Sequence, residues 1–377
     1  MLKIGITCYP SVGGSGIVAT ELGKMLARKG HEVHFITSSV PFRLEEFHPN
    51  IYFHEVEMNH YPVFQYPPYD LTLATKMAEV IDAEKLDILH AHYAMPHAIC
   101  ALLAKDMAAH QVKVVTTLHG TDITVLGIDL SLKKIIQYAI EKSDAVTAVS
   151  NSLVQQTKEM VGVNKDIHVV YNFINEKDYY KKINQKIKEK YNVQEDEKIL
   201  IHISNFRKVK RLQDVVHVFH QVQEHVQSRL LLIGDGPECK KTQELVQELG
   251  LQEKVLFLGK QKNIPELLSI ADIKLLLSEK ESFGLVLLEA MACGVVCIGT
   301  NVGGIPEVIV DGETGYIEEL GDIQAIAHRV IQLFNNDTVR QTMSQASIDR
   351  VKQHFSSDEI RRQYEDVYYS VLGEKNE

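Results

Sequence analysis

The chain has 377 residues, of which 45% are hydrophobic and 24% are charged, and its formal net charge at pH 7 is −10. This length suits two domains of ordinary size, and the composition is that of a soluble globular protein. The acidic balance argues against nucleic-acid binding, and the absence of an apolar run of about 18 residues argues against stable membrane insertion.

The cysteines and the N-terminus point to the cellular compartment. The five cysteines are scattered along the chain, and their number is odd. This pattern predicts free thiols in a reducing environment and no disulfide framework. The first residues, M-L-K-I-G-I-T, resemble a strand and lack a signal-peptide pattern. We therefore expect a cytoplasmic protein.

The first half of the chain begins like a doubly wound α/β domain. An apolar strand over Lys3–Cys8 leads into the glycine-rich loop Tyr9–Gly16, then into a helix over Ile17–Lys29 and a strand over His31–Thr37. The glycines lack the G-x-G-x-x-G spacing, and no acidic residue ends the second strand, so hydride transfer with a dinucleotide is not favoured. The loop is expected either to form a plain tight turn or to lie against a substrate.

Polar residues follow the later strands of this half. The segment Phe47–Asp70 has no clear periodicity and is predicted to be an irregular binding loop. Tyr93 follows a strand over Ile88–Ala91, and the sequence H-G-T-D follows a strand over Lys113–Leu118. Ligands in such domains bind beyond the carboxyl ends of the strands. This position favours a functional role over a purely structural one.

The second half repeats the pattern after a polar connector. We place the domain boundary there, so that residues 1–172 with a last helix near 357–377 form one domain and residues 173–356 form the other. The basic helix Lys181–Tyr191 is interpreted as a solvated face rather than a membrane-binding one. A strand over Lys198–Ile203 runs directly into Ser204–Arg211, which carries four cations where a diphosphate would lie.

Two glutamates frame a later turn in the second half. After an apolar strand over Ile273–Leu277, a helix is predicted to begin at Ser282 or Phe283 and to end at Gly294, with Glu281 before it and Glu289 about two turns along it. Amides at a helix N-terminus bind anions, and a carboxylate can accept hydrogen bonds from vicinal hydroxyls. A pair of solvated glutamates is the alternative, but the apolar helix favours burial, which is costly for an unpaired carboxylate.

The sequence E-S-F-G-L-V-L-L-E-A-M-A-C-G resembles the E-x7-E signature of retaining glycosyltransferase family 4. The resemblance covers nearly the whole chain, through V-G-G-S-G, L-H-G-T-D, S-N-F-R-K-V-K-R, G-D-G-P and G-G-I-P-E-V. It implies the α/β fold class called GT-B, in which two Rossmann-like doubly wound domains face each other across a cleft. The first domain would bind the acceptor and the second the sugar nucleotide.

Within the family, the stretches H-A-H-Y-A-M-P-H-A and L-H-G-T-D-I-T-V-L-G resemble enzymes of bacillithiol biosynthesis. The resemblance implies transfer of GlcNAc from UDP-GlcNAc to the hydroxyl of L-malate, with the α configuration retained. No D-x-D-like cluster follows a strand, so no metal or other cofactor is expected. The alternatives are a family member with a lipid-linked or sugar-phosphate acceptor and a non-catalytic sugar-nucleotide sensor, and the sequence leaves a homo-oligomer open.

The resemblance and the positions after strands together assign the candidate site residues. The catalytic set is His119, Arg207, Lys210 and Glu281. The donor-binding set is Gly14, Ser15, Asn205, Arg211, Phe283, Gly284, Leu285 and Glu289. The acceptor-binding set is Ser15, Tyr93, Thr117, Thr121 and Lys133, with Lys134 as an alternative cation.

Overall fold

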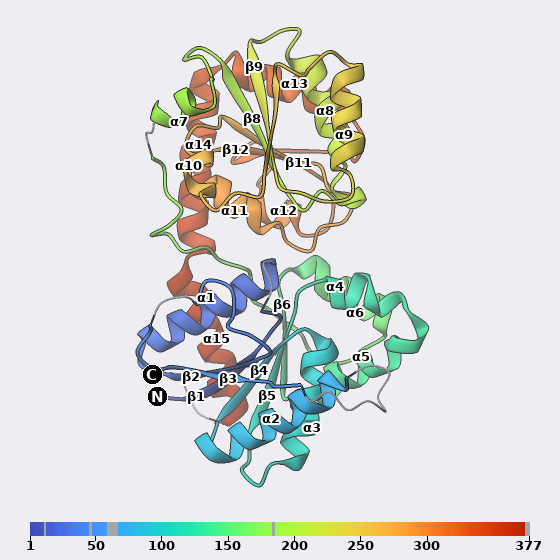
Figure 1. Ribbon diagram of the computed structural model, residues 1–377, viewed down its shortest axis with the longest axis vertical. Helices are drawn as coiled ribbons and strands as arrows, with labels where there is room; N and C mark the ends of the chain where they lie inside the picture. The colour runs from blue at the N-terminus through green and yellow to red at the C-terminus, as the bar shows by residue number, and fades with distance from the viewer. Residues whose placement is uncertain (11–12, 45–46, 59–66, 183–184, 374–377) are drawn as a thin grey trace. The chain divides into compact units, whose positions relative to one another are not determined.

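Two parallel β-sheets organise the chain in the computed structural model, one in each of two units (Figure 1). Unit 1 comprises Met1–Asn172 and Ser357–Glu377, and unit 2 comprises Phe173–Ser356. The structure describes residues 1–10, 13–44, 47–58, 67–182 and 185–373. In each unit helices cover both faces of the sheet, as expected when parallel strands are joined by helical crossovers (Figure 1).

Unit 1 contains a seven-stranded sheet with the strand order β3-β2-β1-β4-β5-β6-β7. Its strands are β1 (Lys3–Thr7), β2 (Glu32–Thr37), β3 (Ile51–Glu55), β4 (Ile88–His92), β5 (Lys113–Leu118), β6 (Ala145–Ala148) and β7 (His168–Val169). Its helices are α1 (Gly14–Arg28), α2 (Tyr69–Glu84), η1 (Ala94–Ala98), α3 (Ile99–Met107), α4 (Thr121–Thr124), η2 (Leu126–Ile128), α5 (Leu130–Lys142), α6 (Asn151–Val161) and α15 (Ser357–Leu372). The strand order reverses between β1 and β4, and such a switch point leaves a crevice at the carboxyl ends of the strands.

Unit 2 repeats this plan with six strands in the order β10-β9-β8-β11-β12-β13. Its strands are β8 (Lys198–Ile203), β9 (Ser228–Ile233), β10 (Val255–Gly259), β11 (Ile273–Leu276), β12 (Val296–Thr300) and β13 (Gly315–Glu318). Its helices are α7 (Gln185–Lys190), η3 (Lys208–Lys210), α8 (Leu212–Val222), α9 (Cys239–Glu248), α10 (Ile264–Leu268), α11 (Leu285–Ala292), α12 (Ile305–Val308), α13 (Ile323–Phe334) and α14 (Asp337–His354). Here the switch point lies between β8 and β11.

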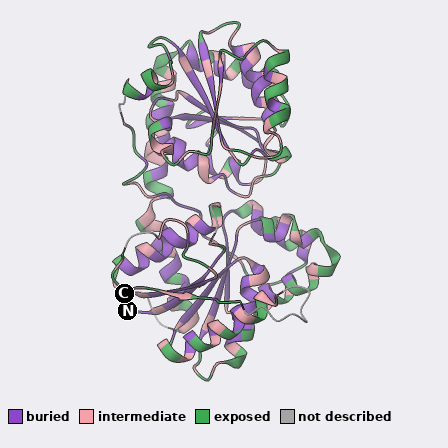
Figure 2. Ribbon diagram, in the orientation of Figure 1, coloured by how far each residue is buried: buried purple, intermediate pink, exposed green. Residues whose placement is uncertain are grey.

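The cores sit on the two faces of each sheet, where the strands are buried (Figure 2). In unit 2, Leu275 and Ile298 of the sheet belong to one apolar cluster with Phe219 of α8 and Val330 of α13. Burial of both faces explains why these strands read as continuous apolar runs rather than as alternating patterns. In the described part of the chain, no helix has the length and apolar character needed to cross a membrane.

Four predicted local structures were wrong. The basic helix predicted over Lys181–Tyr191 corresponds to α7, whose bounds are Gln185–Lys190. The segment Phe47–Asp70 is not wholly irregular, because it contains the edge strand β3, which pairs in parallel with β2. Residues 59–66 of that segment, residues 11 and 12 of the first glycine loop, and residues 183 and 184 of the basic helix lie outside the described residues. The edge strand is only partly buried, so its sequence lacks the apolar run of a central strand.

The other two errors concern helix starts. Helix α1 begins at Gly14, three residues earlier than predicted, with Gly13 as its N-cap. Helix α11 begins at Leu285, later than predicted, because Gly284 has a φ of +92° and cannot continue a right-handed helix. Glu289 therefore lies about one turn along the helix rather than two.

The last helix packs in unit 1. Tyr364 and Tyr368 of α15 are fully buried, and the Tyr368 hydroxyl lies 2.8 Å from His90 Nδ1 of β4. Near the other end of the first strand, His31 Nδ1 accepts a hydrogen bond from the Leu2 amide, and His31 Nε2 lies 3.0 Å from Glu365 Oε1. Two buried polar contacts, together with apolar packing, thus attach the last helix to unit 1.

The Tyr368→Phe substitution tests the first of these contacts. It removes the hydroxyl but keeps the ring, so buried His90 loses its partner at Nδ1. An orphaned buried polar group costs about 1–3 kcal/mol. We expect the free energy of unfolding, measured by urea denaturation with circular dichroism, to fall by that amount. Tyr138→Phe, at an exposed tyrosine of the same unit, is the control, and equal stabilities of the two variants would contradict the assigned role.

Candidate active site

An ion pair joins the two loops at the switch point of unit 2. Lys210 follows β8 and Glu281 follows β11, and Lys210 Nζ donates a hydrogen bond of 2.6 Å to Glu281 Oε2. The amide of Glu279 also donates to the Val209 carbonyl at 2.8 Å, which ties the two loops together through the backbone. Both charged side chains are mostly covered, with 17% and 15% of their surface exposed. The pair therefore presents a fixed cation and a fixed carboxylate side by side.

Two glycines hold the backbone beneath Glu281. The Gly304 amide donates to the Glu281 carbonyl at 3.0 Å. A Cβ atom at Gly303 would lie 1.8 Å from the Glu281 carbonyl oxygen, and one at Gly304 would lie 2.4 Å from that of Ser282. Only glycine allows this close approach. The contact with the Glu281 loop therefore requires glycine at both positions.

The N-terminus of α11 lies directly after this loop. The helix begins at Leu285, so its first amides have no partner within the helix and carry the positive end of its dipole. Glu289 is 8% exposed and lies in the second turn. One short segment of unit 2 thus places the first amides of a helix between two carboxylates in the chain, and anion binding by those amides stays a prediction.

Lys274 is a buried cation that the sequence analysis missed. It lies on β11, its side chain is fully buried, and among the described residues its Nζ has no hydrogen-bond partner. Burial lowers the pKa of Lys274 to about 8, and the nearby charges of Glu289 and Glu281 oppose this shift. The signal in the sequence was a single lysine within the apolar run I-K-L-L-L.

The remaining predicted residues of unit 2 do not all join this group. Arg207 and Asn205 are exposed on the same loop as Lys210, and Arg207 forms no ion pair in the described part of the chain. Arg211 instead pairs with Asp214 of its own helix at 2.5 Å. The Phe283 ring is buried and packs edge-on against Phe355, with ring centroids 5.9 Å apart, so its side chain serves the core.

In unit 1, three predicted residues converge at the carboxyl ends of β1, β4 and β5. Ser15 Oγ donates to the Tyr93 hydroxyl at 3.3 Å, and the rings of Tyr93 and His119 lie 5.4 Å apart. Tyr93 has a φ of +89°, which is rare for a side chain with a Cβ atom and typical of functional sites. Gly14 opens α1 beside Ser15, which adds free helix N-terminal amides to this group.

His119 is held by buried neighbours as a neutral ring. Its Nε2 shares a hydrogen bond of 2.9 Å with Nδ1 of His92, which is fully buried. Burial, and to a lesser extent the charge of His97, lowers the pKa of His119 to about 3. A neutral imidazole carries no positive charge that could stabilise an anion, but it can form a hydrogen bond with a sugar hydroxyl.

Asp122 is a second residue that the sequence analysis missed. It is fully buried, and its carboxylate accepts hydrogen bonds from the amides of Ala94, Gly120 and His119 at 2.9–3.3 Å. Burial raises the pKa of Asp122 to about 6, although these amides stabilise its charge. It therefore fixes the loop that carries His119 to the loop that follows Tyr93. The H-G-T-D motif contained the signal, because short acidic side chains commonly bond nearby amides in turns.

Three predicted acceptor residues lie elsewhere in unit 1. Thr117 is fully buried, and its hydroxyl already bonds His90 and Thr147, both at 2.7 Å. Thr121 is exposed at the start of α4, and Lys133 is partly exposed in α5. In the described part of the chain, no hydrogen bond or ion pair joins Thr121 or Lys133 to the group at Ser15, Tyr93 and His119.

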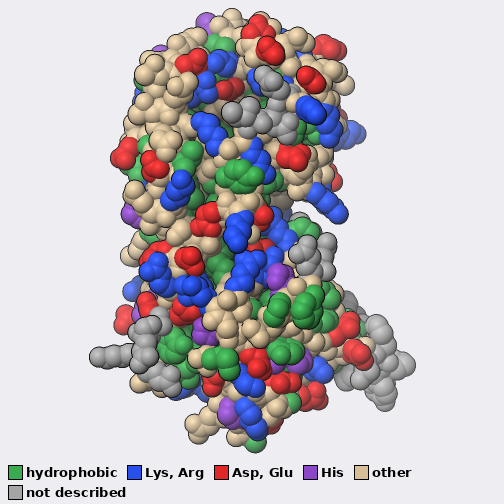
Figure 3. Space-filling view, turned by 90° about the vertical axis from the view of Figure 1, so that its left-hand side faces the viewer, with side chains coloured by type: hydrophobic (Ala, Val, Ile, Leu, Met, Phe, Trp, Pro, Cys, Tyr) green, Lys and Arg blue, Asp and Glu red, His purple; other side chains and the backbone are tan. Residues whose placement is uncertain are grey.

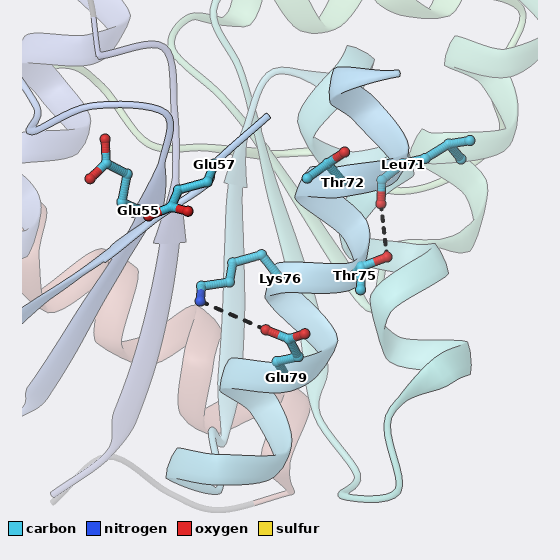
Figure 4. A pocket seen from close by; sticks show the side chains of 7 residues that line it. All are labelled: Glu55, Glu57, Leu71, Thr72, Thr75, Lys76 and Glu79. Carbon is cyan, nitrogen blue, oxygen red and sulfur yellow. Dashed lines mark hydrogen bonds and ion pairs between the residues drawn. The ribbon is translucent and has the colours of Figure 1, made fainter. Parts of the chain in front are cut away.

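Two surface features lie away from these groups of residues. A cavity of about 520 Å³ lies between the end of β3 and α2, and none of the predicted site residues lines it (Figure 4). On the face shown in Figure 3, acidic and basic side chains are interspersed.

Lys274→Met tests the buried ammonium. The pKa falls from 10.5 to about 8 on folding, and each unit corresponds to about 1.4 kcal/mol, so charging costs roughly 3 kcal/mol. Between pH 8 and 10.5 the unfolded state binds the proton and the folded state does not, so wild-type stability rises with pH in this window. We expect the variant to be more stable than wild type at pH 7, with a difference that shrinks as pH rises through that window. Lys280→Met, at an exposed lysine, is the control for urea denaturation, and a difference independent of pH would contradict the assignment.

Two family models match successive parts of the chain. The family models Glycosyltransferase Family 4 and Glycosyl transferases group 1 match residues 12–178 and 183–350. N-acetyl-alpha-D-glucosaminyl L-malate synthase of Bacillus anthracis is 61% identical over 371 residues, which are 98% of this chain and 97% of that protein.

Solved structures show the same architecture. A glycosyltransferase from Rickettsia africae matches with a TM-score of 0.84 at 26% identity, over 98% of both chains. Anabaena HepE, solved in complex with UDP, matches with a TM-score of 0.82 at 20% identity, over 98% of this chain and 100% of that one, and shares the fold. The predicted family and the predicted GT-B fold class are confirmed. The chain belongs to glycosyltransferase family 4.

Proposed function

We propose that the protein is a retaining glycosyltransferase that moves GlcNAc from UDP-GlcNAc to the hydroxyl of L-malate. The products are GlcNAc-α-malate and UDP, and the reaction is the first step of bacillithiol biosynthesis. The observation that carries this proposal is the 61% identity to N-acetyl-alpha-D-glucosaminyl L-malate synthase of Bacillus anthracis along nearly the full length of both chains. The chemistry of the two residue groups supports it.

The group in unit 2 suits a sugar nucleotide. As the bond to the sugar breaks, negative charge grows on the β-phosphate of UDP, and preorganised cations and amides stabilise that charge. Lys210, Arg207 and the amides at Gly284 and Leu285 supply such groups, so the proposed reaction needs no metal. Glu281 is oriented by Lys210 to accept hydrogen bonds from the GlcNAc hydroxyls. In this proposal Glu289 accepts hydrogen bonds from the ribose hydroxyls.

The group in unit 1 suits a small dicarboxylic acid. The first amides of α1, at Gly14 and Ser15, favour a carboxylate because a helix N-terminus binds anions. The hydroxyls of Ser15 and Tyr93 add donors beside them. His119 stays neutral and offers a hydrogen bond to the sugar. Lys133 lies apart from this group, so helix amides rather than that lysine are assigned to the malate.

Retention of configuration follows from attack on the face that the leaving group vacates. The malate hydroxyl oxygen bonds to the anomeric carbon while the bond from that carbon to the β-phosphate oxygen breaks. The hydroxyl proton passes to the departing phosphate. Asp122, the buried carboxylate nearest to His119 in sequence, is held by three backbone amides and is assigned no nucleophilic role.

We also propose the cytoplasm as the site of the reaction, which the five free cysteines favour. The alternatives, another acceptor or a non-catalytic sensor, receive no specific support from the described residues. They become outcomes of the assay below.

The transfer assay measures UDP release by the full chain with UDP-GlcNAc and a panel of acceptors that includes L-malate, a sugar phosphate and a lipid-linked sugar. We expect malate-dependent release. Lys210→Met should lower kcat about 10²- to 10³-fold, because it removes a preorganised cation beside the developing negative charge. Glu281→Gln should also lower kcat, because an amide has only one oxygen to accept hydrogen bonds from the GlcNAc hydroxyls. Lys208→Met, an exposed lysine of the same loop, is the matched control. Release with another acceptor only, or with none, would overturn the proposal.

Tyr93→Phe separates acceptor binding from donor binding. Loss of a hydrogen bond to a charged group costs about 1.5–3 kcal/mol, so the KM for malate should rise roughly 10- to 100-fold. The KM for UDP-GlcNAc should stay near its wild-type value. Tyr138→Phe is the control, and an unchanged KM for malate would count against placing malate beside Tyr93.

A further inference from the structure

Two histidines and a glutamate meet at the outer edge of the unit 1 sheet, away from the groups described above. They are His34 of β2, His54 of β3 and Glu84, the last residue of α2. One ring nitrogen of each histidine and one carboxylate oxygen of the glutamate all lie within 4.8 Å of one another. Between the two rings, His34 Nδ1 lies 2.9 Å from His54 Nε2.

The fold brings these residues together from three elements. His34 pairs with Tyr52 across the parallel strands, so His54, two residues further along β3, projects from the same face of the sheet. On α2, Met77, Val80 and Ile81 are buried, and Glu84 follows them at helical spacing on the same side. Glu84, the last residue of the helix, therefore lies close to the two imidazoles.

A second carboxylate sets the chemistry of His34. Glu32 Oε1 lies 3.0 Å from His34 Nε2 and favours a proton on that nitrogen, which leaves the lone pair of Nδ1 directed toward His54. A carboxylate behind a histidine in this way is the arrangement that orients metal-binding imidazoles. The Tyr52 ring stacks on the His34 ring, with centroids 4.9 Å apart, and limits its rotation.

The charges around the cluster also suit a cation. The carboxylates of Glu32 and Glu84 face one nearby ammonium, that of Lys3, which lies 3.0 Å from Glu32. Burial lowers the pKa of His54, and the positive charge of Lys76 on α2 also lowers it, but this ammonium forms an ion pair with Glu79 at 3.7 Å.

The groove between the same strand and helix is acidic. The cavity there is lined by Glu55 and Glu57 from the strand side and by Lys76 and Glu79 from α2, as Figure 4 shows. Glu79 lies little more than one turn before Glu84 on this helix. Three carboxylates and one ammonium therefore line this cavity, so its charge is net negative.

We propose that His34, His54 and Glu84 bind a zinc ion, with Glu32 as the group that orients His34. Two imidazoles and a carboxylate form a recurring zinc ligand set that leaves a position for water. Zinc–nitrogen bonds of about 2.0–2.1 Å place two tetrahedral ligands about 3.3 Å apart, so the two nitrogens need to separate by only a few tenths of an ångström. The ion would join the edge strand β3, its neighbour β2 and the end of α2.

The test uses the untagged full chain after removal of metal by a chelator. Zinc binding is measured by calorimetry, and cobalt is used as a spectroscopic substitute whose visible bands report four- or five-coordinate geometry. We expect one ion per chain in the wild type and in His168→Gln, a matched control at an exposed histidine of the same unit. His54→Gln and Glu84→Gln should abolish the cobalt bands, and Glu32→Gln should weaken zinc binding about 10- to 100-fold.

Thermal unfolding supplies a second readout that is independent of turnover. Zinc should raise the Tm of the wild type and of His168→Gln but not that of His54→Gln or Glu84→Gln, since a ligand stabilises only the state that binds it. Circular dichroism shows which variants remain folded, and if His54→Gln is unfolded, Glu84→Gln and Glu32→Gln decide the outcome. Fewer than one bound ion in the wild type, or equal affinity in wild type and folded Glu84→Gln, would overturn the proposal.

Discussion

The contact between Lys210 and Glu281 is the interaction on which the unit 2 site depends. Each residue comes from a loop at the point where the strand order reverses, and a parallel sheet leaves its crevice there. The two side chains are mostly covered, so each would be costly to bury without the other. Their pairing gives the carboxylate one orientation and the ammonium one position before any substrate binds. Catalysis by charge stabilisation requires such preorganisation.

The same constraint explains why glycine recurs around the glutamate. Gly303 and Gly304 let a second loop approach the backbone of Glu281 to within hydrogen-bond distance. Gly284, in a left-handed conformation, ends the loop that carries Glu281. The helix that follows can then direct its free amides toward the same region. The loop is thus fixed by backbone contacts, while its charged side chains remain available for a ligand.

Unit 1 uses a different device, a set of buried imidazoles. His90, His92 and His119 lie ring against ring, with successive centroids 4.3 and 5.1 Å apart, and Tyr368 of α15 bonds the first of them. Burial keeps the rings neutral. The last helix of the chain therefore supports the residue that is expected to face the sugar. Asp122 adds the backbone anchor for the same loop.

Much of the fold could be predicted from the sequence because buried parallel strands leave continuous apolar runs. The runs at Lys198–Ile203 and Ile273–Leu277, for example, correspond to β8 and β11 within one residue. The edge strand β3 was missed because its sequence has no such run. The start of α11 was misplaced because the positive φ of Gly284 depends on how its loop packs, and local sequence does not reveal that.

The sequence by itself determined the family and the glutamate spacing, because these depend on residue type and order along the chain. Only the tertiary structure decided which side chains meet. It pairs Lys210 with Glu281, turns Arg211 to Asp214, buries Thr117 and Phe283, and brings Lys274 beneath the glutamates. It also joins His34, His54 and Glu84 from three separate elements. The physical reason is that hydrogen bonds and ion pairs act over a few ångströms in space, whereas Lys210 and Glu281 lie 71 residues apart along the chain.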